Sequence, residues 1–186
     1  LNLIKNIAIA PPDNLSEEDK KKYKKTKIKL FTFESSAEEI QNKLVQMMTG
    51  ISVIKIEKGE LSEEEVDKYQ EALKEVASSP ISYDDSSEIT LPLLRTKIRK
   101  AVAEGAEVIF IDQLEQILLG GSGDAQQEHI KLNYISYRLK AYQREMDTRI
   151  IIVHQRKKVG EESRNRDPEL SDLNQAGGKA PDGVMM

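Results

Sequence analysis

The sequence contains two runs of unbroken apolar residues that fit strands buried on both faces of a sheet. One is Val-Ile-Phe-Ile at residues 108–111, which ends abruptly in Asp112, and the other is Ile-Ile-Ile-Val at residues 150–153. Continuous apolar residues are typical of parallel strands that helices cover on both sides. Parallel strands need long crossover connections, so the segments between them must carry helices. The two runs therefore indicate an α/β architecture.

The rest of the chain shows helix and strand signals in alternation. Ser36 with Glu39 and Ser62 with Glu65 form capping-box patterns, each at the start of a predicted helix. Because helices between apolar strands form βαβ units, the sequence predicts a mainly parallel sheet with helices on both faces. Strands are expected at residues 27–33, 81–85, 107–112 and 149–154, and helices at about residues 1–10, 37–49, 51–57, 63–77, 90–104 and 126–146.

Composition excludes several classes of protein. The 186 residues carry a formal net charge of -4, so the chain is not a uniformly basic nucleic-acid coat, and contacts with DNA or RNA require local basic patches. There is no Cys and only two His, which excludes a disulfide framework and argues against a zinc centre. The apolar runs are far shorter than the roughly 20 residues of a membrane span. We therefore expect a cytoplasmic protein without membrane contacts.

Polar residues stand where three of the predicted strands end. Glu34 follows the first strand, Asp112 ends the 107–112 strand, and Gln155 comes directly after the last one. In a doubly wound sheet the carboxyl ends of parallel strands meet at one crevice, where ligands bind. Asp112 suits a Mg²⁺ ion held through water, because Mg²⁺ keeps most of its waters and takes few protein carboxylates. Glu34 suits a general base and Gln155 a γ-phosphate contact, which together predict nucleotide hydrolysis.

Each of these residues also has a purely structural interpretation. Asp112 can cap the turn that follows its strand, Glu34 can interact favourably with a helix dipole, and Gln155 can be a solvated loop amide. Their expected convergence on one edge of the sheet counts for more than any of them alone. We therefore predict one shared site.

Basic residues are concentrated in two segments. Residues 11–26 form a charged insertion, with closely spaced lysines that continue to position 29. Such a segment either attracts nucleic-acid phosphates, with strong salt dependence, or is a solvated surface insertion. The second segment follows the last predicted strand and contains Lys157, Arg164 and Arg166, which are candidates for nucleic-acid contact.

The order of these motifs resembles the RecA-like motor domain of DnaB-type replicative helicases. Residues 31–40 are similar to the family's strand and catalytic glutamate, residues 109–114 to its Walker B strand, and residues 150–155 to the strand that ends in its γ-phosphate-sensing Gln. Ser-Asp-Leu-Asn-Gln-Ala-Gly at residues 171–177 resembles the loop that faces single-stranded DNA. The resemblance covers nearly the whole chain and implies an α/β fold, the RecA-like P-loop NTPase core.

The resemblance also implies roles for individual residues. Glu34 would be the catalytic base, Asp112 would hold Mg²⁺ through water, and Gln155 would sense the γ-phosphate. ATP and Mg²⁺ would be the cofactors. The expected partners are single-stranded DNA, further copies of the chain in a hexameric ring, a primase and a helicase loader. The expected DNA-binding residues are Lys157, Arg164, Arg166, Asn174, Gln175 and Gly177.

The sequence departs from the family pattern in two places. It has no Gly-x-x-x-x-Gly-Lys-Ser/Thr phosphate loop, although residues 1–10 resemble the helix that follows one. Asn174 and Gln175 stand where the family usually has Arg and Glu. We expect residues 1–186 to be a single RecA-like domain that is incomplete at both ends and does not hydrolyse ATP by itself. Three functions stay open: a helicase motor, a RecA-family ATPase of recombination or signalling without unwinding, and a non-catalytic scaffold relative.

Overall fold

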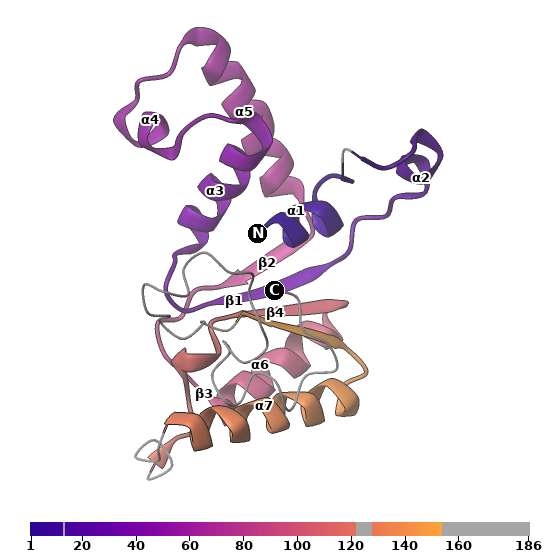
Figure 1. Cartoon of the computed structure of the whole chain (residues 1–186), viewed down its shortest axis with the longest axis vertical. Coiled ribbons are helices and arrows are strands. Elements are labelled where there is room, and N and C mark those ends of the chain that lie inside the picture. The colour runs from indigo at the N-terminus through magenta and orange to yellow at the C-terminus, as the bar shows by residue number, and fades with distance from the viewer. Residues whose placement is uncertain (13, 122–127, 154–186) are drawn as a thin grey trace, which may run out of the picture.

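The structure is a computed structural model that describes residues 1–12, 14–121 and 128–153, and parallel strands form its centre (Figure 1). Within these residues the main sheet has four strands in the order β2-β1-β4-β6, and all neighbours in it are parallel. A second, two-stranded parallel sheet contains β3 and β5. The predicted parallel sheet is thus confirmed. The bounds are Ile28–Thr32 (β1), Ile81–Asp84 (β2), Ile89–Thr90 (β3), Val108–Asp112 (β4), Ile117–Leu118 (β5) and Arg149–Val153 (β6).

Helices cover both faces of the main sheet, as the sequence predicts (Figure 1). α1, α3 and α5 pack on one face, and α6 and α7 pack on the other. Among the described residues, no helix has the combined length and apolar character that crossing a membrane requires. The helices span Asn2–Ala8 (α1), Glu17–Lys22 (α2), Ala37–Thr49 (α3), Val53–Lys58 (α4), Glu63–Ser78 (α5), Leu91–Ala103 (α6) and Glu128–Glu145 (α7), and Leu114–Gln116 forms the 3-10 turn η1.

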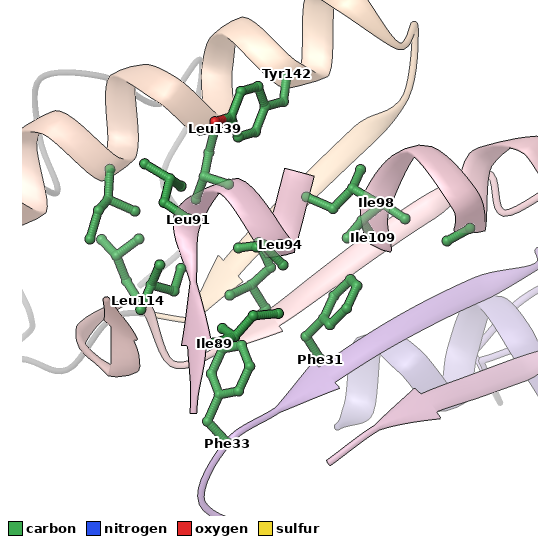
Figure 2. Close-up of a cluster of buried hydrophobic side chains, with 14 of the residues drawn as sticks. Phe31, Phe33, Ile89, Leu91, Leu94, Ile98, Ile109, Leu114, Leu139 and Tyr142 are labelled. Atoms are coloured by element: carbon green, nitrogen blue, oxygen red, sulfur yellow. The ribbon is translucent and has the colours of Figure 1, made fainter. Parts of the chain in front are cut away.

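Successive residues of the central strands alternate between two hydrophobic cores. Leu30 and Phe110 belong to the core under α1, α3 and α5, whereas Phe31 and Ile109 belong to the core under α6 and α7. Both faces of β4 are therefore apolar, which explains its unbroken apolar run, and β1 contributes apolar residues to both cores although it also carries Lys29. Figure 2 shows the second core, whose labelled side chains include Phe31, Phe33, Ile98, Ile109, Leu139 and Tyr142.

The two predicted capping boxes are present. In α3 the Glu39 backbone N–H donates to Ser36 Oγ at 3.2 Å, and the Ser36 N–H donates to Glu39 Oε2 at 3.1 Å. In α5 the same pair of bonds joins Ser62 and Glu65 at 3.2 and 3.0 Å. Each box satisfies backbone donors that the first turn of a helix leaves free. Gly50 then ends α3 with a left-handed φ of 75°, a conformation that favours glycine.

Some elements of the structure are absent from the sequence prediction. β3 and β5 have two residues each, which is too short for a hydrophobic period to show. α2 forms within the charged segment 11–26, where the Asp19 N–H donates to Ser16 Oγ at 3.1 Å and caps the helix. None of the α2 residues is buried, so local capping and charge pairs hold this helix.

Candidate functional site

Glu34 and Asp112 lie at the same edge of the main sheet. β1 and β4 are neighbours in a register that pairs Thr32 with Asp112, so Glu34 comes two residues after the last pair. The backbone continues this pairing by one bond, since the Phe33 N–H donates to the Asp112 carbonyl at 3.0 Å. Asp112 is partly buried, and Glu34 is exposed. Two of the three predicted site residues are therefore brought together at the carboxyl ends of adjacent strands.

The turn between β1 and α3 is fixed by side-chain bonds on both sides of Glu34. The buried Thr32 hydroxyl donates to the Ser35 carbonyl at 2.8 Å, and the Ser36 capping box follows directly. Asp85, just beyond the end of β2, accepts a bond from the Ala37 N–H at 3.1 Å. These bonds leave the Glu34 backbone little freedom, although its side chain lies in solvent.

Two glutamines hold the Glu34 carboxylate. Gln113 Nε2 donates to Glu34 Oε2 at 3.0 Å, and Gln116 Nε2 donates to Glu34 Oε1 at 3.1 Å. Both glutamines belong to the segment after β4, where Gln113 is the N-cap of η1 and Gln116 its last residue. The sequence prediction assigns neither residue a role. Their Gln-x-x-Gln spacing places both side chains on the same side of a 3-10 turn, but the sequence does not indicate that this turn forms.

The surroundings of Asp112 disfavour its negative charge. Partial burial raises the pKa of the Asp112 carboxyl, and the nearby negative charge of Glu34 raises it further. The ammonium of Lys43 acts in the opposite direction, but the net shift of the pKa is upward. A cation bound beside Asp112 would relieve this unfavourable charge.

The residues present fit one mode of Mg²⁺ binding. Among the described residues there is no group of three or more His, Cys, Asp or Glu side chains that could hold a metal ion by themselves. Mg²⁺ commonly binds through one or two carboxylates, with waters and substrate phosphates completing its shell. The single carboxylate of Asp112, partly buried at a strand end, suits this second arrangement.

Comparison with known proteins decides the family. The model of the family described as "DnaB-like helicase C terminal domain" matches residues 1–186. This chain belongs to that family.

The relatives of this DnaB-like domain are longer proteins. Replicative DNA helicase DnaB of Helicobacter pylori is 26% identical over 153 residues, which are 81% of this chain and 31% of that protein. A probable plasmid replicative DNA helicase of Chlamydia trachomatis serovar L2 is 32% identical over 152 residues, 81% of this chain and 33% of that protein. The chain thus spans about a third of the length of these curated relatives.

Solved structures show the same fold. One of them, described as an ATPase domain, has a TM-score of 0.72 and 23% identity, covering 82% of this chain and 55% of the other. A DnaB-like replicative helicase, solved in a study of its interactions with primase, has a TM-score of 0.73 and 22% identity, covering 91% and 40% of the two chains. The DnaB-like domain therefore has the predicted α/β RecA-like fold.

The lysines of the DnaB-like domain's charged segment mostly contact acceptors within the protein. Several form ion pairs or bond to backbone carbonyls. These contacts favour the interpretation of this segment as a solvated surface insertion over that of a phosphate-attracting patch. The contacts join Lys20 to Glu17 and Lys22 to Glu18, both at 2.9 Å, Lys25 to Glu75 at 3.8 Å, Lys27 to the Glu104 carbonyl, and Lys29 to the Tyr83 carbonyl at 2.8 Å.

The other predicted site residues lie outside the described residues. Gln155 comes two residues after Val153, the last residue of β6, which pairs with Asp112. Its role stays a prediction, as do the DNA contacts expected for Lys157, Arg164, Arg166, Asn174, Gln175 and Gly177.

Proposed function

We propose that this domain is the motor of an ATP-dependent replicative DNA helicase, which unwinds duplex DNA by moving along a single strand. The observation that carries the proposal is the adjacency of Glu34 and Asp112 at the carboxyl edge of a parallel sheet. Ligands of open α/β sheets bind at this edge. Membership of the DnaB-like helicase C-terminal domain family supports the same activity, as do relatives named as replicative DNA helicases.

The residues divide the work of ATP hydrolysis. Asp112 would hold Mg²⁺ by accepting hydrogen bonds from its waters, and the ion would supply positive charge that offsets the charge on the phosphate oxygens. Glu34 is exposed and lies beside Asp112, so its carboxylate would accept the proton of the attacking water. Gln155 would hydrogen-bond the γ-phosphate and report its loss. Little covalent chemistry is required of the protein, since phosphoryl transfer depends mainly on positioning and charge.

Movement on DNA would use the residues that follow β6. Lys157, Arg164 and Arg166 would contact phosphates, and Asn174, Gln175 and Gly177 would form a loop that faces the strand. Copies of the chain would assemble into a hexameric ring, with ATP bound between neighbouring subunits. A primase and a helicase loader would be its protein partners. One structural relative was studied for its interactions with primase, which supports the first of these.

Glu34→Gln in the full-length protein tests the proposal, because the amide keeps the shape of the side chain and cannot accept the proton. DNA-stimulated ATP turnover should fall by about 10²-fold to 10⁴-fold, the usual contribution of a general base. Unwinding of a forked duplex should be lost, whereas the thermal midpoint should change little because Glu34 is exposed.

Glu38→Gln is the matched control, since it removes an exposed carboxylate four residues away on α3. It should leave turnover within about twofold, as expected for a surface residue outside the site. Unaltered ATP turnover in Glu34→Gln would overturn the base assignment. Turnover without unwinding by the wild-type protein would instead indicate a RecA-family ATPase of another kind, and no turnover would indicate a scaffold.

A further inference from the structure

We infer that Gln113 and Gln116 are positioning residues, which hold the Glu34 carboxylate in the orientation that activates water; this inference rests on the proposed function. The two amides donate to different oxygens of one carboxylate, at 3.0 and 3.1 Å. One donor would leave the carboxylate free to rotate about the bond that carries it. Two donors on its two oxygens fix the plane of the group.

The geometry of η1 places both amides on the same side. β4 ends at Asp112, and the chain turns through Gln113 into η1, where the Gln116 N–H donates to the Gln113 carbonyl at 3.4 Å. Residues three apart in a 3-10 turn lie directly above one another, so their side chains point the same way. A Gln-x-x-Gln spacing therefore lets two amides donate hydrogen bonds to the two oxygens of one carboxylate.

The turn is anchored in the hydrophobic core. Leu114 and Ile117 are buried at 2% and 0% exposure and belong to the core under α6 and α7, while Gln113 and Gln116 are only partly buried. Apolar side chains packed at core density allow little movement of the backbone that carries them. The two amides thus extend from a backbone that the core holds in place, and they bond to the Glu34 side chain, which is exposed and has no core contacts of this kind.

Neutral donors suit this role. An ionised carboxylate has about four acceptor positions on its two oxygens, so two amide bonds leave positions free for a water. A Lys or Arg in the same place would also orient Glu34, but it would add a positive charge beside the group that must take up a proton. Asp112 directly precedes Gln113 in the chain, so the two amide bonds also fix Glu34 relative to the residue proposed to hold Mg²⁺.

Leucine substitutions in the full-length protein test the inference, because leucine has nearly the size of glutamine and no donor. Gln113→Leu and Gln116→Leu should each lower kcat for DNA-stimulated ATP hydrolysis by about 3-fold to 10-fold. The double variant should lower it by about 10-fold to 100-fold, since a misplacement of about 1 Å can reduce a rate by about 10²-fold. The KM for ATP should stay within about twofold in each variant. Gln70→Leu, at an exposed glutamine of α5, should change neither constant.

The decisive readout is the dependence on Glu34. If the glutamines act through this carboxylate, adding the double substitution to Glu34→Gln should lower turnover no further, because the group that they position has already lost its function. A merely structural role would lower turnover in both backgrounds and would lower the thermal midpoint as well. Should the double variant fail to fold, Gln116→Met decides, since methionine has nearly the length of glutamine, carries no donor and adds no charge beside Glu34, and kcat should still fall.

The possible results separate the inference from the proposed function. Wild-type turnover that depends on Glu34, together with normal kcat in the double variant, overturns the positioning role alone. A rise in kcat also overturns it, because the amides would then restrain Glu34 in an inactive orientation. Turnover that does not depend on Glu34 overturns the proposed function and the positioning role with it. Loss of kcat that requires Glu34 supports both.

Discussion

Removal of the Ser36 hydroxyl should affect both the stability of the domain and its turnover. In the structure the Glu39 N–H donates to Ser36 Oγ at 3.2 Å, and the Ser36→Ala variant removes this acceptor. Loss of an N-cap serine destabilises a protein by about 1 kcal/mol, with a range of about 0.5–2. For a domain of this size, 1 kcal/mol corresponds to a fall of about 2–4 °C in the thermal midpoint. Ser36→Gly should destabilise it by only a few tenths of that energy, since glycine caps nearly as well.

The effect on turnover follows from the place of this cap. Ser36 is two residues after Glu34, and the turn between them precedes the first residue of α3. Fraying of that first turn would release the backbone that carries the proposed base. Because a general base must stay within hydrogen-bond reach of its proton, ATP turnover should fall by about 3-fold to 10-fold. The fall would therefore exceed what a small loss of stability can explain.

The chain contains its own control for this argument. Ser62 caps α5 with the same chemistry, at bond lengths of 3.2 and 3.0 Å. α5 begins next to α4, at the end of the α3 and α5 pair that lies away from the sheet (Figure 1). Ser62→Ala should therefore lower the midpoint by a similar amount and leave turnover unchanged.

Thermal melts and ATP turnover of the three full-length variants check these expectations. Equal losses of turnover in Ser36→Ala and Ser62→Ala would show that the α3 cap affects activity only through stability. Unchanged midpoints in both variants would show that these capping bonds make no net contribution. The first result refutes the link between the cap and the position of Glu34, and the second refutes the expected loss of stability.

Two further predictions concern β4. Burial and the charge of Glu34 raise the pKa of Asp112 in the folded protein. The protonated carboxyl therefore stabilises the fold. This stabilisation is fully present below the unfolded pKa of about 3.9 and is lost as the pH rises through the raised folded pKa. Asp112→Asn should therefore raise the thermal midpoint of the nucleotide-free protein at pH 7 while abolishing Mg²⁺-dependent turnover; a lower midpoint across a pH 4–8 series would contradict this. Ile111→Ala should destabilise the domain by about 2–5 kcal/mol and Ile111→Val by about 0.5–1.5, because the side chain is fully buried. Equal denaturation midpoints for these two variants would show that the core collapses around the cavity.

Much of the fold was predictable because its signals are local or strongly periodic. Both faces of the apolar run before Asp112 must be buried, and in the structure helices cover both faces. Both capping boxes follow from the fixed three-residue spacing between Ser and Glu, which needs no tertiary partner. The placement of Glu34 and Asp112 at one edge follows from parallel topology, since parallel strands all end on the same side.

The features that the sequence did not predict depend on contacts between segments far apart in the chain. β3 pairs with β5 across 28 positions, Ile89 with Ile117, and neither strand is long enough to show a period. The bonds from Gln113 and Gln116 to Glu34 span 79 and 82 positions. They also require the segment after β4 to be a 3-10 turn, which its sequence does not indicate. Sequence reasoning thus located the edge of the site but not the residues that hold it.

The register of β1 on β4 shows why polar residues matter for both the fold and the proposed chemistry. Both strands carry apolar residues on both faces, so the alternation of side chains alone selects the register only weakly. Moving β4 by two residues along β1 would keep each side chain on its own face. A shift toward the start of β1 would, however, move Asp112 into the interior of the sheet, which helices cover on both faces. An ionised carboxylate buried there without a partner is strongly unfavourable. The observed pairing of Thr32 with Asp112 avoids this penalty, and it places the Asp112 carboxylate at the edge of the sheet, near enough to Glu34 for the charge of Glu34 to raise its pKa.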